Sequence, residues 1–225
     1  MKLPFMPEAW SMFLPVLAGG GFLLFAGSYW DNGFLIFIGV VVLVIAALIL
    51  NFFRDFERSA KDLKANQVIS PADGKVVIVK NEVEKFFLKK TSVHIAIFMN
   101  PLNNHVQRAP FDGKVIKKVY HAGEFLAAYD DKADLVNEQA HLLVELKSKD
   151  KKSKAKGQIV IKQIAGLLCR RVKTDVEAGD TLSRGSRIGR ILLGSRVDVF
   201  MPKGFKSKVK VGDQVKAGVT VLGEF

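Results

Sequence analysis

The chain has 225 residues, of which 49% are hydrophobic and 25% charged, and 34 Lys and Arg stand against 22 Asp and Glu. This length suits one globular domain preceded by a smaller, more apolar segment. The single cysteine, Cys169, excludes an intrachain disulfide and a cluster of thiolate metal ligands. All but one of the basic residues follow residue 53, so the carboxyl-terminal part would attract a polyanion, either nucleic acid or an anionic membrane face.

Two uncharged runs, residues 10–28 and 33–53, each approach the roughly 20 residues that a helix needs to cross a bilayer. Only four residues separate them, so the sequence predicts a transmembrane helical hairpin that forms a membrane anchor over residues 1–53. Pro15 and three consecutive glycines lower the helix propensity of the first run, although membrane helices tolerate such residues.

Basic residues crowd the end of the second run, whereas the short connecting loop has none. The positive-inside rule therefore predicts that both termini are cytoplasmic and that the remaining domain lies on the cytoplasmic side of the cell (inner) membrane. Residues 54–65 are predicted to be an interfacial linker. They would either lie along the lipid headgroups or form an ordinary solvated connection.

Residues 66–225 are rich in short segments that alternate between apolar and polar residues and end at Gly, Pro or Asn, the pattern of β-strands. The clearest of these segments are residues 75–79, 92–98, 114–120, 141–146 and 158–164. A lysine-rich stretch, 147–156, is predicted to be a hairpin tip, and 129–140 a short helix or ordered loop. The predicted fold is mainly β, with few short helices.

Two short sequences recur within this domain. Residues 71–76 reappear as 110–115, and residues 176–182 are echoed by 209–215, each copy joining a glycine turn to a following strand. This rhythm is similar to that of barrel-sandwich domains such as the lipoyl and biotinyl carriers. The lysine that those carriers modify is missing, so the similarity indicates shared architecture rather than shared function.

Ser195 follows Gly194 at what reads as the exposed end of a strand, where a serine can act as a nucleophile on an accessible neighbouring carbonyl. The same Gly-Ser-Arg sequence occurs at 185–187, and either copy alone is typical of a turn. Asp73 and His105 lie in other loops, and with Ser195 they could form a relay in which aspartate orients histidine and histidine deprotonates serine. Each also has an ordinary explanation, an Asx-turn for Asp73 and a solvated loop position for His105.

Five blocks in order along the chain resemble the short bacterial and archaeal form of the phosphatidylserine decarboxylase family. They are residues 51–58, 70–76, 97–110, 163–166 and 194–199. The resemblance implies a self-processing proenzyme that cleaves itself between Gly194 and Ser195 into a β chain (1–194) and an α chain (195–225), which stay together as a heterodimer. Ser195 would become a pyruvoyl group, and neither pyridoxal phosphate nor a metal would be needed.

The family's activity, carried over, is conversion of an anionic serine phospholipid in the membrane to phosphatidylethanolamine and CO2 through a Schiff base with the pyruvoyl group. Asp73 matches the family's triad aspartate, and His105 matches a histidine of its histidine-containing loop. The chain has Arg108 and Arg196 where the longer enzymes have a second histidine and a threonine. Roles in both cleavage and decarboxylation are therefore assigned to His105 as a hypothesis.

Arg108, Arg196 and Gln163 are candidate substrate-binding residues, and the two arginines are equally well explained as ordinary surface or salt-bridge residues. Three other interpretations stay open: an archaetidylserine decarboxylase, a membrane-tethered lipid-binding or carrier module, and, more weakly, a serine hydrolase. The sequence also leaves a higher homo-oligomer open. Nucleic acid is disfavoured as a partner because aromatic residues do not cluster with the lysines.

Overall fold

The structure is a computed structural model that describes residues 4–58, 60, 62–124, 126, 136–147, 157–166, 172–191 and 195–225. Most of the predicted tip at 147–156, most of the predicted helix or loop at 129–140, Cys169 and Gly194 lie outside the described residues. The chain forms two compact units, Met1–Glu57 and Arg58–Phe225. Its elements are α1 (Glu8–Tyr29), α2 (Gly33–Phe52), β1 (Gln67–Ile69), β2 (Gly74–Val83), β3 (Thr91–Met99), β4 (Val106–Arg108), β5 (Gly113–His121), β6 (Gln139–Leu146), β7 (Gln158–Ile164), β8 (Val172–Thr174), β9 (Thr181–Leu182), β10 (Arg187–Ile191), β11 (Ser195–Met201), β12 (Lys206–Ser207), β13 (Gln214–Val215) and β14 (Val221–Glu224).

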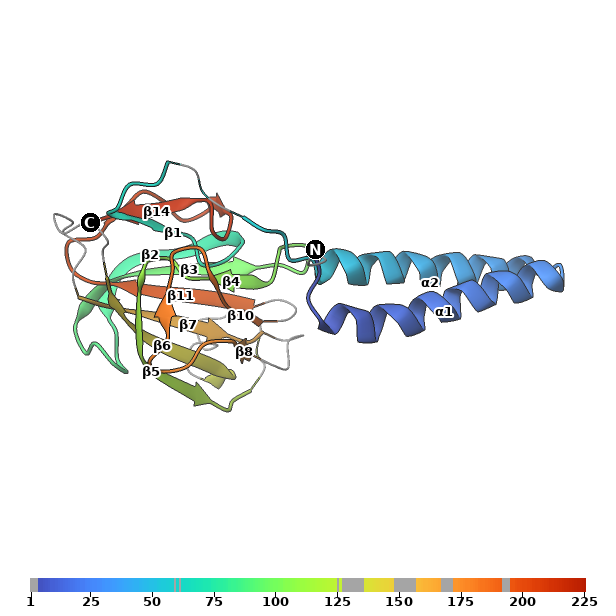
Figure 1. The fold of residues 1–225 in the computed structure, drawn as a ribbon, viewed down its shortest axis with the longest axis horizontal. Helices are drawn as coiled ribbons and strands as arrows, with labels where there is room; N and C mark the ends of the chain where they lie inside the picture. Colours follow the sequence, from blue (N-terminus) through green and yellow to red (C-terminus); the bar gives the residue numbers. More distant parts are fainter. Residues whose placement is uncertain are drawn as a thin grey trace. The chain divides into compact units, whose positions relative to one another are not determined.

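The first unit is the expected hairpin of two helices, α1 and α2, which lie side by side (Figure 1). Both helices are long and apolar enough to cross a membrane. The glycines permit close packing, because a Cβ on Gly20 would lie 2.7 Å from the Leu43 side chain, and one on Gly39 would lie 2.8 Å from the Leu24 side chain. Asn32 caps α2 by accepting hydrogen bonds from the first backbone N–H groups of that helix.

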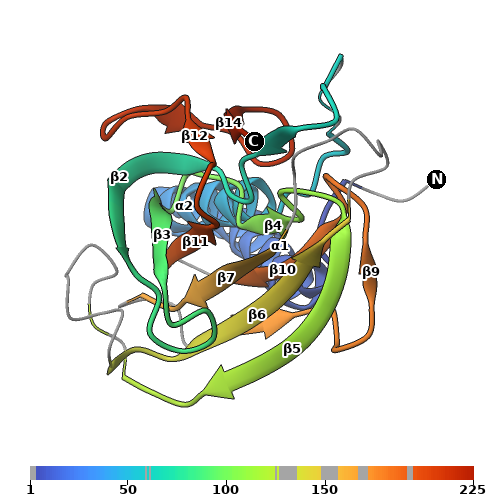
Figure 2. The same cartoon turned by 90° about the vertical axis from the view of Figure 1, so that its left-hand side faces the viewer.

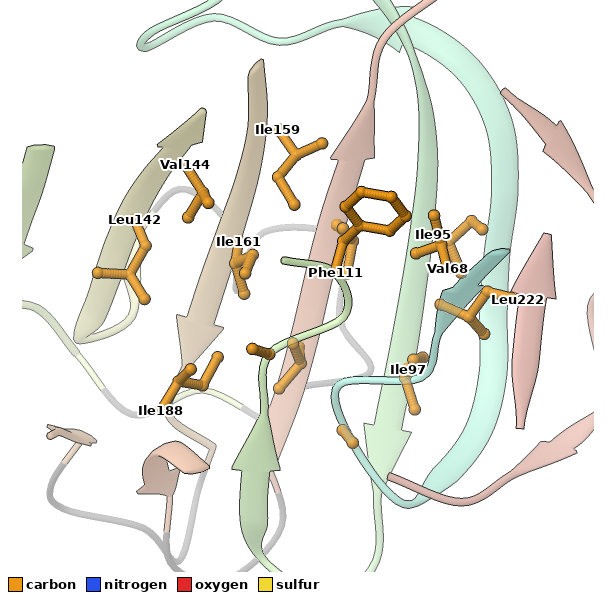
Figure 3. Packing of buried hydrophobic residues seen from close by; sticks show 14 of the residues in the cluster. Val68, Ile95, Ile97, Phe111, Leu142, Val144, Ile159, Ile161, Ile188 and Leu222 are labelled. Carbon is orange, nitrogen blue, oxygen red and sulfur yellow. The ribbon is translucent and has the colours of Figure 1, made fainter. Parts of the chain in front are cut away.

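The second unit is built on an antiparallel sheet of eight strands in the order β13-β2-β3-β11-β7-β6-β5-β9, which curls strongly (Figure 2). Two smaller three-stranded sheets, β1-β14-β12 and β4-β10-β8, complete the domain. Ile95, Ile97, Leu142 and Ile161 are among the fully buried side chains that form the core on one face of the large sheet (Figure 3). The mainly β fold with an amino-terminal helical hairpin is confirmed.

Each copy of the first recurring sequence begins one of the long strands. Gly74 opens β2 and Gly113 opens β5. Side chains are excluded at both positions, since a Cβ on Gly74 would lie 2.1 Å from the carbonyl oxygen of Phe98, and one on Gly113 would lie 2.5 Å from that of Glu145. The repeated Asp-Gly therefore marks two places where the backbone passes directly against a neighbouring strand.

The second recurring sequence supplies the partner of each strand. The turn before β9 bonds to β5, where Val115 N–H donates to the carbonyl of Asp180 (2.9 Å). The turn before β13 bonds to β2 in the same way, where Val76 N–H donates to the carbonyl of Asp213 (2.9 Å). The two sequence echoes therefore correspond to two structurally equivalent halves of one domain.

Candidate functional site

Ser195 is the first residue of β11, a strand that lies between β3 and β7 in the large sheet. It is paired with Met99, the last residue of β3, and is fully buried. The expectation that Ser195 lies at an exposed strand end is therefore wrong, because β11 is an interior strand with every residue buried. Its Oγ is a buried polar atom with no hydrogen-bond partner among the described residues, an arrangement that costs free energy.

His105 follows a turn that is braced by asparagine side chains. Asn103 Oδ1 accepts the N–H of Asn100, and Asn104 Oδ1 accepts the N–H of Val106, so the turn between β3 and β4 is held by its own residues. The His105 ring is buried, and its Nδ1 lies 2.9 Å from the carbonyl oxygen of Asn103. Because a carbonyl only accepts, Nδ1 carries the hydrogen and the lone pair of the neutral ring is on Nε2.

The segment that joins β10 to β11 begins beside His105 and ends beside β3. Ile191 N–H, at the end of β10, points at the carbonyl oxygen of His105 at 3.4 Å. Four residues later Ser195 pairs with Met99, which directly precedes the turn that carries His105. Gly194 lies outside the described residues, but both ends of its segment are anchored at the same edge as His105. The described ends of this segment, Ile191 and Ser195, thus lie beside His105 and beside the last residue of β3, but Ser195 Oγ forms no hydrogen bond with His105 in the described part of the chain.

A chain of buried amides supports the backbone of His105. Gln107 Nε2 donates to the His105 carbonyl (2.8 Å), and Gln163 Nε2 donates to Gln107 Oε1 (3.1 Å). Thr174 Oγ1 donates to Gln163 Oε1 (2.6 Å), which completes the connection from β8 to β4. A Cβ on Gly189 would lie 2.7 Å from Gln163 Nε2, so the glycine makes room for this amide. Gln163, a predicted substrate-binding residue, is thus hydrogen-bonded within the protein to Gln107 and Thr174.

Asp73 has partners other than those expected of a relay. Its carboxylate forms a bidentate ion pair with Arg58, in which Nη1 meets Oδ1 and Nη2 lies 3.1 Å from Oδ2. Oδ1 also accepts the N–H of Ala217 (2.7 Å). In the relay, Asp73 would instead bind His105, whose Nδ1 meets the Asn103 carbonyl.

The contact between Asp73 and Ala217 has an equivalent in the other half of the domain. Asp112, the equivalent aspartate of the other half, accepts the N–H of Arg184 through Oδ1 at 2.8 Å. Both aspartates therefore accept a backbone N–H two residues after the short strand that pairs with their own long strand. These bonds are long-range, unlike those of an Asx-turn, in which the side chain bonds its own backbone two residues on. The feature that distinguishes Asp73 is its ion pair with Arg58, which begins the second unit.

The twin Gly-Ser sequence lies in an ordinary turn. Gly185 has φ of +86°, and Ser186 N–H donates to the carbonyl of Ser183 (2.9 Å). Arg108 is buried beside this turn, and its Nη1 donates to the carbonyl of Gly185 (2.9 Å). Arg108 therefore secures the turn that contains the second Gly-Ser.

Arg196 is also buried, on the face of β11 opposite the core, with 2% of its surface exposed. Its guanidinium binds Asp198 through two bonds, Nε to Oδ1 (2.8 Å) and Nη2 to Oδ2 (2.9 Å). Burial alone would raise the pKa of the Asp198 carboxyl, but Arg196, together with His94, outweighs burial and lowers the pKa to about 2. The charge of Arg196 is thus balanced within the protein.

Low pH should reduce the stabilising contribution of the ion pair between Arg196 and Asp198. Because the pKa of Asp198 is lower in the folded protein than its ordinary value of 3.8, its stabilising contribution is complete above pH 3.8 and is lost as the pH falls toward about 2. We expect the unfolding free energy of the wild type to fall over this window by on the order of 2 kcal/mol more than that of Asp198→Asn. Urea titrations of the full chain in detergent at several pH values measure the difference. Parallel pH profiles for the two proteins would contradict it.

A pocket of about 520 Å³ lies elsewhere in the same unit. Arg58, Leu63, Asp112 and Arg184 are among its lining residues. Its two guanidinium groups are engaged, Arg58 by Asp73 and Arg184 by the carbonyls of Lys64 and Gln67. Within the described residues, Ser195 and His105 do not line this pocket. The chemistry of Ser195, rather than this concavity, therefore defines the candidate site.

Three groups that contact the candidate residues were not predicted from the sequence. Arg58 lies in a block that carries the family resemblance, yet nothing in the sequence links it to Asp73. Gln107 bonds the backbone carbonyl of His105 two residues earlier, and Asp198 is two residues from Arg196 in β11, so these last two lie on the same face of the strand. The period-two spacing was a usable signal for Asp198, since it places opposite charges side by side on β11.

Comparison with known proteins identifies the family. The family model described as phosphatidylserine decarboxylase matches residues 45–223. A phosphatidylserine decarboxylase proenzyme of Desulfotalea psychrophila is 39% identical over 184 residues, which cover 82% of each chain. The proenzyme of Aromatoleum aromaticum is 42% identical over 176 residues (78% of each chain), and that of Burkholderia mallei is 38% identical over 221 residues, 98% of this chain and 92% of the relative. Matches of this length and identity, around a buried serine at the start of β11, place the chain in the phosphatidylserine decarboxylase family of enzymes.

Proposed function

We propose that this protein is a self-processing phosphatidylserine decarboxylase that makes a pyruvoyl prosthetic group from Ser195. The observation that carries the proposal is the buried Ser195 Oγ, which has no hydrogen-bond partner among the described residues. A structural serine at an interior strand position normally finds a partner. A hydroxyl consumed in a reaction of the chain itself has no such requirement, so the position fits a residue that becomes the prosthetic group.

In the proposed cleavage, Ser195 Oγ attacks the carbonyl carbon of Gly194 while His105 Nε2 accepts the hydroxyl proton. The peptide C–N bond breaks, an ester forms, and the nitrogen of residue 195 takes up the proton. Removal of the α-proton of residue 195 then expels the Gly194 carboxylate and leaves a dehydroalanine. Addition of water and loss of ammonia complete the conversion, so one water is consumed in the net reaction.

The described residues around Ser195 support this chemistry by burying and positioning the reacting groups. Met99 and the other neighbours of β11 bury the start of the strand, and the amides of Gln107 and Gln163 support the backbone of His105. When present, the pyruvoyl group would bind the amine of the serine phospholipid as a Schiff base and accept the electron pair released with CO2. No metal or pyridoxal phosphate is needed for that step.

We also propose that α1 and α2 anchor the protein in the cytoplasmic membrane, with the β domain on the cytoplasmic side. The support is the apolar length of both helices and the cluster of basic residues that follows α2. The substrate is a membrane lipid, so anchoring would keep the catalytic domain beside it. The β chain (1–194) and α chain (195–225) would remain associated, because β11 is paired with β3 and β7.

Intact mass spectrometry of the purified protein tests the proposal. We expect a carboxyl-terminal fragment that begins at residue 195 and is lighter than the corresponding serine peptide by one ammonia. A single full-length mass after prolonged incubation would contradict self-processing and would favour a membrane-tethered lipid-binding module. Decarboxylation of phosphatidylserine in vesicles, measured as CO2 release, tests the activity separately.

Asp73 and Asp112 provide a matched pair for testing the relay. Both accept a backbone N–H at equivalent positions, but the family resemblance assigns only Asp73 to a triad, and only Asp73 also pairs with Arg58. We expect Asp73→Asn to slow self-cleavage by about tenfold or more, whereas Asp112→Asn leaves the rate within about twofold. Gel densitometry of the two fragments over time measures both rates. Equal effects of the two substitutions would show that Asp73 acts only as a turn residue.

A further inference from the structure

A cluster of polar and charged side chains lies directly after the proposed cleavage position. It consists of three buried residues, Arg196 and Asp198 on β11 and His94 on β3, together with Glu82 on β2, whose side chain is 33% exposed. His94 Nε2 lies 3.1 Å from Asp198 Oδ2, and His94 Nδ1 contacts Glu82 Oε1. The His94 ring also stacks on Phe200 of β11, with ring centroids 4.3 Å apart. β3 is thus connected to β11 through His94, and β2 is connected to His94 through Glu82.

The alternation of side chains explains why these groups meet. Val197 and Val199 point into the core, so Arg196 and Asp198 share the opposite face of the sheet. His94 lies opposite Phe200 in the register of β3 and β11 and reaches Asp198 on the same face. Within the described residues, Arg196 is the first residue of β11 that pairs on both sides, with Phe98 and Ile164.

Such a cluster is better suited to fixing geometry than to adding stability. Burying charges carries a large desolvation cost, which a close pair only offsets, so a buried ion pair often adds little net stability. A bidentate bond between a guanidinium and a carboxylate does fix the relative position of both groups. The Arg196 side chain, 3% exposed and one residue beyond Ser195, is held in this way by the Asp198 side chain, which is 0% exposed.

We propose that Asp198, acting through Arg196, is a positioning residue that keeps the amino-terminal end of β11 in the sheet after the bond before Ser195 has been broken. This inference rests on the proposed self-processing. Before cleavage, Ser195 is held by the chain on both sides. After cleavage, residue 195 becomes a strand end, and ends of the chain open locally unless they are tied down. The ionic cluster supplies that restraint at the residue bonded to the proposed prosthetic group.

The test compares one substitution before and after cleavage. Asp198→Asn is made in the wild-type chain, which is processed, and in Ser195→Ala, which should remain intact. Amide hydrogen exchange of the peptide that contains residues 195–199 is measured by mass spectrometry. We expect Asp198→Asn to accelerate exchange by about tenfold in the processed protein and by less than about threefold in the intact one. Asp175→Asn, which removes the partner of Arg190 at 2.9 Å, is the matched control and should change neither value.

A second variant and two possible results distinguish failure of this inference from failure to fold and from failure of the proposed function. If Asp198→Asn does not fold, Arg196→Lys retains the charge but loses the bidentate geometry, and the same contrast is expected from it. Equal acceleration in processed and intact chains would overturn the inference and assign the cluster a purely structural role. A wild-type chain that is never cleaved would overturn the proposed function, and this inference with it.

Discussion

Replacing Ser195 with alanine is expected to leave the protein as a single chain of full length and to abolish decarboxylation. The substitution removes the only atom proposed to attack the Gly194 carbonyl, and alanine has no leaving oxygen from which a pyruvoyl group could form. The loss should be complete rather than partial, because no other described side chain at the start of β11 carries a hydroxyl. Denaturing gels and intact mass spectrometry check the first effect, and CO2 release from phosphatidylserine vesicles checks the second.

The protein contains its own control for this experiment. Ser186 follows Gly185 and precedes an arginine, as Ser195 follows Gly194 and precedes Arg196. Ser186 lies in a turn with φ of +86° at its glycine, whereas Ser195 lies in an interior strand. Ser186→Ala should therefore be cleaved at the wild-type rate. Cleavage of Ser195→Ala at residue 194, or loss of cleavage in Ser186→Ala, would each contradict the assignment of Ser195.

Ser195→Ala is expected to lose activity without losing stability. Removing a buried hydroxyl that lacks a partner relieves a desolvation cost, so Ser195→Ala should be at least as resistant to unfolding as the uncleaved wild-type chain. An inactive but stable variant is what a residue placed for chemistry predicts. This pattern would distinguish lost reactivity from lost folding.

The β-strands could be predicted because their signals are local. The segments 92–98 and 158–164 alternate in period two, and they are strands β3 and β7 in the structure. The repeated Asp-Gly at 73–74 and 112–113 marked the equivalent starts of β2 and β5. The same repeat also explains why Asp73 contacts Ala217. From the sequence alone, Asp73 could be described only as a turn residue.

The contacts of the site could not be predicted because they depend on strand order. Ser195 is buried since β3 and β7, which are distant in sequence, flank β11. Arg58 reaches Asp73 across fifteen residues, with no periodic signal to indicate the pairing. A pattern of residue types identified Ser195 and His105 as candidates, but only the register of the sheet shows that Met99 connects them. Residue chemistry was thus visible in the sequence, whereas the environment of each residue was not.

His105→Ala is expected to slow self-cleavage by about 10² to 10⁴-fold, the range that a positioned general base contributes. The hydrogen bond between Nδ1 and the Asn103 carbonyl leaves Nε2 as the basic nitrogen of the neutral ring, and the turn that carries His105 directly follows the strand residue paired with Ser195. Fragment formation on a time scale of hours to days would reveal the residual rate. His121→Ala, which changes a partly exposed histidine on β5, is the control and should be cleaved normally.

Chemical rescue distinguishes a lost base from a disturbed fold. Imidazole added to His105→Ala can occupy the space left by the side chain and accept the Ser195 proton, so cleavage should accelerate with imidazole concentration. The same treatment should have no effect on Ser195→Ala, which lacks the hydroxyl. Processed His105→Ala, once isolated, also allows decarboxylation to be measured separately from cleavage. If this variant were cleaved and decarboxylated its substrate at wild-type rates, the base for both steps would have to be another residue, and the role given to His105 would be wrong.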